Sequence, residues 1–315
     1  MQLPELSDII QSYKRINPFI HKTPVITSKQ INNIFGGELF FKCENFQKTG
    51  SFKFRGATNA VLQLNDKDRK QGVITHSSGN HGAALALAAS TVGVKSCVVM
   101  PSNAPAVKKD AVKGYGAEIV FCEPTQEARE QTTSEIIEKR GAILIHPYNN
   151  FNVICGQGTA SVEFLEQIPD LDIIIAPVGG GGLLSGTAIA VKGLKPDIKV
   201  FGAEPENAND AFKSFTTGIL CPSLSPKTVA DGLLTSLSEL TFAVIRKYAD
   251  NIYTVSEESI VECMRLIWER LKIIIEPSSA VTLAVIMENP GLSNGKKVGL
   301  ILSGGNVELS KLPFN

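Results

Sequence analysis

Short runs of β-branched apolar residues alternate with longer stretches of helical spacing along most of this chain, and this alternation limits the folds open to it. The run Ile173-Ile174-Ile175-Ala176 is apolar at every position, which is typical of a strand covered on both faces of its sheet. Strands that alternate with helices predict βαβ units and a mainly parallel sheet. We expect strands at residues 72–75, 96–100, 118–122, 142–146, 172–177, 199–203 and 297–303. We expect helices at residues 82–92, 106–115, 127–140, 159–167, 183–193, 257–270 and 278–287.

Length and composition indicate a globular protein without a strongly charged partner. The 315 residues are enough for two domains or one large α/β unit, and 43% of them are apolar. Thirty-one basic residues balance 31 acidic ones, so neither nucleic acid nor a membrane surface is an expected partner. The six cysteines are scattered singly, which argues against a zinc site or a disulfide framework. No signal peptide is visible and the apolar runs are shorter than a membrane span, so we expect a cytoplasmic protein.

One lysine, Lys53, stands between two phenylalanines in the segment Gly50-Ser51-Phe52-Lys53-Phe54-Arg55-Gly56-Ala57, where a loop of small residues opens a helix. Apolar surroundings disfavour the charged ammonium, so they lower the pKa of the amine and make it nucleophilic. Such a lysine can form a Schiff base with an aldehyde. A lysine taken alone would instead be interpreted as an exposed residue at a helix start.

The segment His76-Ser77-Ser78-Gly79-Asn80-His81-Gly82 follows a predicted strand and opens a predicted helix. Such a junction offers backbone N–H groups and the positive end of a helix dipole to an anion. The alternative is a simple helix cap, in which Ser78 or Asn80 satisfies the free N–H groups of the first turn.

Four consecutive glycines, Gly179 to Gly182, follow another predicted strand and allow backbone N–H groups to converge on a phosphate. The alternative is a dinucleotide motif, because Gly180-x-Gly182 is followed by Gly186 and Glu204 ends the next strand. The spacing Gly-x-Gly-x-x-x-Gly is one residue longer than that motif requires, and a dinucleotide would leave Lys53 without a role. A phosphate cup is therefore favoured. The last strand ends at Ser303, in Ser303-Gly304-Gly305-Asn306, where a capping serine is the simplest interpretation.

Taken together, these four segments resemble the pyridoxal-phosphate enzymes of fold type II, in the branch of serine racemases and serine/threonine dehydratases. The resemblance runs from about His21 to Glu308 and keeps the order of every segment. It implies an α/β fold like that of the tryptophan synthase β chain, with two open, twisted, mainly parallel sheets. It also implies a large domain at residues 1–69 and 149–315, a small domain at residues 70–148, a homodimer and an amino-acid substrate.

The resemblance also assigns roles to single residues. Lys53 would carry the cofactor and take a proton from one face of the substrate, and Ser78 would serve the opposite face. Contacts with pyridoxal 5′-phosphate are implied for Phe52, Lys53, Asn80, Gly179, Gly180, Gly181, Gly182, Leu183, Glu276 and Ser303. Contacts with the substrate are implied for Ser77, Ser78, Asn80, His81, Arg129 and Thr235, although a histidine at position 81 is more often structural.

A metal site is implied at Glu204, the main-chain carbonyl of Ala208, and Asp210. Hard oxygen ligands of this kind suit Mg²⁺, and Ca²⁺ or Mn²⁺ are alternatives. The residues alone would be interpreted as an acidic turn. An ion at this place is expected to stabilise the structure and to take no part in bond chemistry.

The function predicted on this basis is interconversion of L- and D-serine, with β-elimination of serine to pyruvate and ammonia as an accompanying reaction. A serine at position 78 makes racemisation possible but is also found in some dehydratases. A dehydratase for serine, threonine or 3-hydroxyaspartate, a nicotinamide-dependent oxidoreductase, and a binding protein without activity stay open, as does a nucleotide effector. Tyr148 stands where some serine racemases have asparagine, which puts the substrate preference in doubt.

Overall fold

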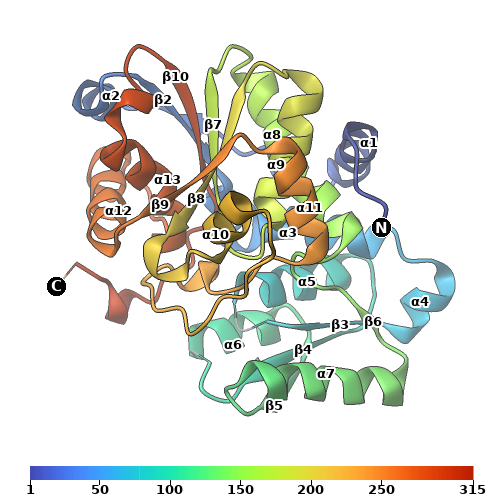
Figure 1. Cartoon of the computed structure of the whole chain (residues 1–315). Coiled ribbons are helices and arrows are strands. Elements are labelled where there is room, and N and C mark those ends of the chain that lie inside the picture. The colour runs from blue at the N-terminus through green and yellow to red at the C-terminus, as the bar shows by residue number, and fades with distance from the viewer. Residues whose placement is uncertain (78, 105, 315) are drawn as a thin grey trace.

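The computed structural model describes residues 1–77, 79–104 and 106–314, and within them the strands form two separate sheets (Figure 1). The larger sheet has six strands in the described part of the chain. Only its edge strand β1 pairs in antiparallel fashion; the other pairs are parallel. Its order is β1 (Val25–Ile26), β2 (Glu38–Cys43), β10 (Lys297–Leu302), β7 (Ile173–Pro177), β8 (Lys199–Pro205) and β9 (Asn251–Val255).

Helices cover both faces of the larger sheet, as the near-continuous apolar strands require. One face packs on a core formed with α2 (Lys29–Phe35), α12 (Glu257–Leu271) and α13 (Pro277–Glu288). The other face packs on α8 (Phe151–Gln167), α9 (Gly182–Leu194), α10 (Asp210–Thr217) and α11 (Glu239–Tyr248). The helices α1 (Leu6–Ile16) and α3 (Lys53–Leu62) add a further layer against α8. The larger sheet, at whose strand ends the candidate site residues lie, is therefore covered by helices on both faces.

The smaller sheet lies at the bottom of Figure 1 and is parallel throughout. Four strands, all within the described residues, follow the order β5 (Glu118–Cys122), β4 (Ser96–Pro101), β3 (Val73–His76) and β6 (Ile143–Leu144). Its helices are α5 (Asn80–Thr91), α6 (Ala106–Gly114) and α7 (Gln126–Arg140), and α4 (Asp66–Gln71) precedes β3. The chain enters this unit after α3 and leaves it before α8. The domain boundaries at residues 69/70 and 148/149 stay predictions.

The predicted α/β architecture with mainly parallel sheets is confirmed, but two element boundaries were wrong. The helix expected from residue 159 begins at Phe151, where the Asn150 side chain accepts a hydrogen bond from the backbone N–H of Val153 at 3.0 Å. Its glycines at 156 and 158 suggest a break, but they lie inside the helix where it packs closely on α3 and α9. The strand expected at 142–146 is reduced to Ile143–Leu144. Among the described helices, none is long and apolar enough to cross a membrane.

Candidate active site

The candidate site forms where Lys53 begins α3 beside the end of β10. The backbone N–H of Phe52 donates to the carbonyl of Ser303 at 3.0 Å, and Ser51 forms an isolated bridge with Gly304. The backbone N–H of Gly305 donates to the carbonyl of Gly50 at 2.9 Å. These bonds join two segments about 250 residues apart in the sequence. They bring Lys53 and Ser303, two of the predicted cofactor contacts, into one place.

The Lys53 amine is held in the surroundings that its sequence context predicts. Its Nζ donates to the carbonyl of Pro147 at 3.0 Å and lies 5.0 Å from the centroid of the Phe52 ring. Burial lowers the pKa of Lys53 to about 8, against the opposing charge of Glu276. A neutral amine is therefore accessible near physiological pH, as nucleophilic or base chemistry requires. Pro147 was not among the predicted site residues, and nothing in its sequence context marks it.

The glycine run lies at the end of β7 and leads into α9. Gly181 precedes this helix with a φ of +83°, a left-handed conformation that glycine adopts without strain. Gly182 and Leu183 are buried in its first turn, whose backbone N–H groups have no partner within the helix. The Tyr148 ring packs on the run so closely that a Cβ atom at Gly180 would collide with it. The run therefore offers N–H groups without side chains, which fits a phosphate.

Asn80 and His81 begin α5, and their side chains point to different partners. The Asn80 amide donates to both carboxylate oxygens of Glu276, each at 3.0 Å. The ring of His81 contacts the carbonyl of Ile145 through Nε2 at 3.0 Å, so that nitrogen carries the proton. Burial, followed by the charge of Lys53, lowers the pKa of His81 to about 3. His81 is thus a neutral ring that anchors α5, in line with the structural interpretation.

Ser77 lies at the same turn, where its hydroxyl accepts from the backbone N–H of Gly79 at 3.3 Å. The prediction made for Ser78 lies outside the described residues. At the neighbouring strand end, Ser303 Oγ lies 3.1 Å from Ser279 Oγ. Ser279 Oγ also bonds both backbone groups of Gly304, at 2.7 and 2.8 Å, and so fixes the turn that presents Ser303.

Glu276 connects the two sides of the site. It is buried, and burial raises the pKa of its carboxyl to about 7, although the Asn80 hydrogen bonds act in the opposite direction. The backbone N–H of Asn306 also donates to it, at 3.3 Å. Glu276 and Lys53 therefore have pKa values of about 7 and about 8, so both groups can gain or lose a proton near neutral pH.

A cavity of about 270 Å³ opens between the two sheets next to Asn80. The ion pair between Lys108 of α6 and Asp231, at 2.7 Å, spans the same gap. Lys108 was not predicted as a site residue, since a lysine on a helix surface carries no distinguishing signal. The residues around the cavity are Thr49, Gly50, Gly79, Asn80, Ala83, Lys108, Ala111, Tyr115, Asn306 and Val307.

Two of the predicted substrate contacts lie at the edge of this arrangement. Arg129, on α7, donates to the carbonyl of Thr125 at 3.3 Å. Burial, followed by the charge of Arg129, lowers the pKa of His76. Burial raises the pKa of Tyr148 and the charge of Arg129 opposes this shift, so Arg129 lies near both rings. Thr235 is exposed in the loop after Leu233. Within the part of the chain that the structure describes, Thr235 forms no hydrogen bond with Lys53.

The predicted metal ligands meet at the end of β8. Both carboxylate oxygens of Glu204 accept backbone N–H groups at the start of α10, at 3.0 and 2.8 Å. Asp210 accepts from the backbone N–H of Leu237 at 3.2 Å through one oxygen. Its other oxygen is buried and has no hydrogen-bond partner among the residues that the structure describes. Burial raises the pKa of Asp210 to about 6 and that of Glu204 well above its ordinary value. A buried carboxylate oxygen without a donor fits a cation.

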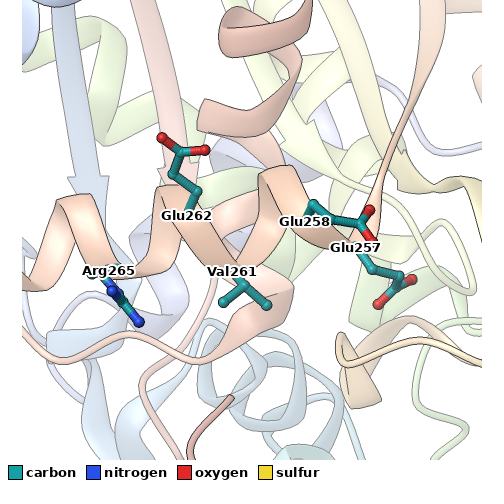
Figure 2. Close-up of a pocket in the computed structure, with 5 residues that line it drawn as sticks. All are labelled: Glu257, Glu258, Val261, Glu262 and Arg265. Atoms are coloured by element: carbon teal, nitrogen blue, oxygen red, sulfur yellow. The ribbon is translucent and has the colours of Figure 1, made fainter. Parts of the chain in front are cut away.

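A second hollow, of about 490 Å³, lies along the surface of α12 (Figure 2). It is formed by Glu257, Glu258, Val261, Glu262 and Arg265. None of the predicted site residues lines it. The Glu257 carboxylate already accepts from Thr228 and from the backbone of Val229, at 3.1 and 2.7 Å. This hollow is therefore not the candidate active site.

A mainly parallel α/β framework, a half-buried lysine and a glycine run at a helix N-terminus are the features of an enzyme that holds a phosphorylated aldehyde cofactor. Residues 16–304 match the family described as pyridoxal-phosphate dependent enzyme, and the chain belongs to that family. This membership confirms the predicted fold type and favours pyridoxal phosphate over the nicotinamide alternative.

Relatives with assigned activities match nearly the whole chain. A serine racemase from Dictyostelium discoideum is 53% identical over 98% of this chain and 96% of its own length. A crystal structure of serine racemase from that organism has a TM-score of 0.92, covering 97% of this chain and 99% of that one. A beta-hydroxyaspartate dehydratase from Paracoccus denitrificans is 49% identical over 100% of both chains. The resemblance to serine racemases and dehydratases is thus confirmed.

Proposed function

We propose that this chain is a serine racemase that also eliminates water from serine to give pyruvate and ammonia. The observation that carries the proposal is the position of Lys53, whose amine has a pKa of about 8 next to the end of β10 at Ser303. It bonds Pro147, whose neighbour Tyr148 packs on the glycine run. The 53% identity to a serine racemase supports the choice of substrate. When bound, pyridoxal phosphate supplies an electron sink that makes the Cα proton of an amino acid acidic.

The residues of this chain divide the remaining work. The N–H groups of the glycine run would hold the phosphate, Phe52 would pack on the ring, and Ser303 would bond the ring nitrogen. The N-terminus of α5, with Ser77 and Asn80, would hold the carboxylate of the substrate. Lys53 Nζ would take the Cα proton on its own face, and Glu276, bonded by Asn80, would keep a proton within the site.

The two reactions differ in what happens on the face opposite to Lys53. Racemisation requires a proton donor there, and we propose Ser78 for this role on sequence grounds. Elimination requires only the Lys53 face and protonation of the departing hydroxyl. The change Ser78→Ala should therefore stop formation of D-serine while pyruvate formation persists. Unchanged racemisation in that variant would contradict the assignment of Ser78.

A dehydratase for 3-hydroxyaspartate is the second candidate function. It is favoured by Arg129, whose charge reaches His76 and Tyr148 and could bind a second carboxylate. The 49% identity to a beta-hydroxyaspartate dehydratase supports it as well. Arg129→Met should reduce the turnover of a dicarboxylic substrate far more than that of serine.

One incubation separates these candidates. Purified enzyme, loaded with cofactor, is given L-serine and Mg²⁺, and D-serine is followed by chiral chromatography together with pyruvate. D-serine at a rate comparable with that of pyruvate would support the racemase. Pyruvate alone would support a serine dehydratase, and neither product would direct the test to 3-hydroxyaspartate and threonine.

Three finer features are part of the same proposal. Glu204, the carbonyl of Ala208 and Asp210 would bind Mg²⁺, with Ca²⁺ or Mn²⁺ as alternatives, and the free oxygen of Asp210 supports this. A homodimer is proposed, which light scattering would test. A cytoplasmic location and a nucleotide effector also stay predictions, and added nucleotide in the serine assay would test the effector.

A further inference from the structure

Four buried charged side chains form a cluster at the N-terminal end of α3, the helix that carries Lys53. Lys42 lies at the end of β2 and Glu44 directly after this strand, Arg55 lies on α3 and Glu163 on α8, and all four are fully buried. Two cations face two anions, so the cluster has no net charge. We call it the Arg55 cluster.

Arg55 uses its whole guanidinium within this cluster. Nε and Nη2 donate to the two oxygens of Glu44 at 2.7 and 2.9 Å, and Nη1 and Nη2 donate to the two oxygens of Glu163, each at 2.8 Å. Threonine hydroxyls accept weaker bonds at 3.3 and 3.4 Å. Two bidentate contacts fix both the position and the plane of the group, which a lysine cannot do.

The remaining charges are equally well paired. Lys42 Nζ donates to Glu163 at 2.9 Å, to Gln167 at 2.9 Å and to the carbonyl of Thr23 at 2.8 Å, which uses all of its protons. Burial alone would raise the pKa of Glu163, but hydrogen bonds and charge from Arg55 and Lys42 hold it below its ordinary value. Burial lowers the pKa of Lys42, against the charges of Glu44 and Glu163. Each cation of the cluster is therefore paired with a carboxylate.

The cluster joins the elements that carry the active site. Lys42 and its neighbour Cys43 pair with Ile301 and Leu302, so Glu44 follows β2 at the level where Ser303 follows β10. Glu163 lies on α8, whose Gly158 packs against Gly186 of α9, the helix that begins at the glycine run. One guanidinium thus connects the supports of Lys53, Ser303 and the phosphate cup.

Lys53 depends on such a support because it lies in the first turn of α3, where the backbone N–H groups have no partner inside the helix. The bond from Phe52 to Ser303 holds one side of this turn. Arg55, two residues after Lys53, holds the other. Next to it, a Cβ atom at Gly156 would come within 2.6 Å of the Arg55 carbonyl oxygen, so α3 and α8 touch at their backbones.

A buried ion cluster contributes little net stability compared with apolar residues of the same size, because removing the charges from water is costly. Its distinctive property is geometric. We propose that Arg55 is a positioning residue for the proposed reaction, which fixes the Lys53 amine against the substrate through its two bidentate carboxylate contacts.

The test is Arg55→Lys, which keeps the charge but removes the bidentate geometry. This proposal rests on the proposed function. For the Arg55→Lys enzyme loaded with pyridoxal phosphate, we expect kcat with serine to fall about 10- to 100-fold, because the reacting amine is misplaced. KM should change less than about threefold, because Arg55 does not touch the substrate. The matched control is Arg140→Lys at an exposed bidentate pair with Glu118, which should change neither constant.

A second measurement does not depend on activity. The full chain, with its cofactor removed by hydroxylamine, is acetylated over a range of pH, and the modification of Lys53 is followed by mass spectrometry. In the unchanged protein the midpoint should lie at about pH 8, set by burial and by Glu276. His81 and His146, which feel the charge of Lys53, remain neutral in this range because burial lowers their pKa values. In the Arg55→Lys variant the amine of Lys53 should become more accessible to water, and the midpoint of its acetylation should rise by about one pH unit.

A merely structural role would lower the thermal midpoint and leave both kcat and the Lys53 titration unchanged, and that result would overturn the proposal. If Arg55→Lys does not fold, Glu163→Gln keeps the size of the side chain and should shift the Lys53 titration in the same direction by less. An unshifted titration in a folded Glu163→Gln protein would equally overturn it. If the unchanged enzyme does not act on serine, the proposed function fails, while the titration still tests Arg55.

Discussion

The large sheet carries two buried groups of acidic side chains, and they are built in opposite ways. In the Arg55 cluster, two carboxylates face two cations and every charged group has bonded partners. In the Asp210 group, which consists of Glu204, Ala208 and Asp210, the carboxylates bond backbone N–H groups, and the Ser223 side chain also bonds Asp210. Among the residues that the structure describes, neither of these two carboxylates forms an ion pair, and the charge of Lys213 is the weakest influence on each.

The pKa directions express this difference. Charge from Arg55 and Lys42 overcomes burial and lowers the pKa of Glu163. At Asp210 and Glu204 burial prevails and raises the pKa. In the Arg55 cluster the chain itself supplies the cations that balance the carboxylates, and the cluster holds its side chains in fixed positions. The Asp210 group lacks positive charge, which is the condition that a bound cation would correct.

The largest effect on stability should come from removing Arg55 from the Arg55 cluster. Arg55→Met leaves two buried carboxylates with Lys42 alone, and we expect the free energy of unfolding to fall by about 3–5 kcal/mol. Thermal unfolding followed by circular dichroism would measure it. A loss below about 1 kcal/mol would mean that the cluster relaxes or admits water.

The stability of the protein should depend on pH in opposite directions through the Arg55 cluster and the Asp210 group. The pKa of Asp210 is raised to about 6 in the folded state, so the folded state binds more protons than the unfolded state above about pH 4. The stabilising contribution of Asp210 is present at low pH and is lost as the pH rises through 6, by up to about 3 kcal/mol. Glu163, with a lowered pKa, contributes in the opposite sense and loses its contribution as the pH falls. Thermal midpoints from pH 4 to 7 in the presence of a chelator, compared between the unchanged protein and Asp210→Asn, would reveal this difference.

A cation should act on the second group only. At about 100 times its dissociation constant, Mg²⁺ should stabilise the unchanged protein by about 2.7 kcal/mol. Asp210→Asn should abolish this gain, whereas Arg55→Lys should keep it. An equal response of all three proteins to Mg²⁺ would place the ion elsewhere.

The smallest effect is expected at an exposed pair outside both groups. Glu118→Gln breaks the bidentate contact with Arg140 at the surface of the small sheet. Because water screens this pair, the thermal midpoint should stay within experimental error. A clear loss would show that charge pairing matters here regardless of burial.

Features of the fold that depend on neighbouring residues could be predicted from the sequence, whereas contacts that depend on packing could not. The glycine run, the strand ends and the helix that begins at Lys53 all follow from neighbouring residues. The contacts of Lys53 with Pro147 and of Glu276 with Asn80 join residues 94 and 196 positions apart, and no local pattern indicates them. The same holds for the partners of Arg55, since Glu44 and Glu163 are unremarkable acids until the fold buries them. The early start of α8 was missed because glycines that serve helix contact look like helix breaks.

The contact between Tyr148 and the glycine run also constrains how this site can change over evolution. Since the ring occupies the space that any side chain at position 180 would need, neither position can be altered without regard to the other. A library randomised at both should return glycine at 180 whenever an aromatic residue stands at 148. Larger residues at 180 should survive only beside a small residue at 148, so that these two positions, 32 apart in the sequence, are inherited as one unit.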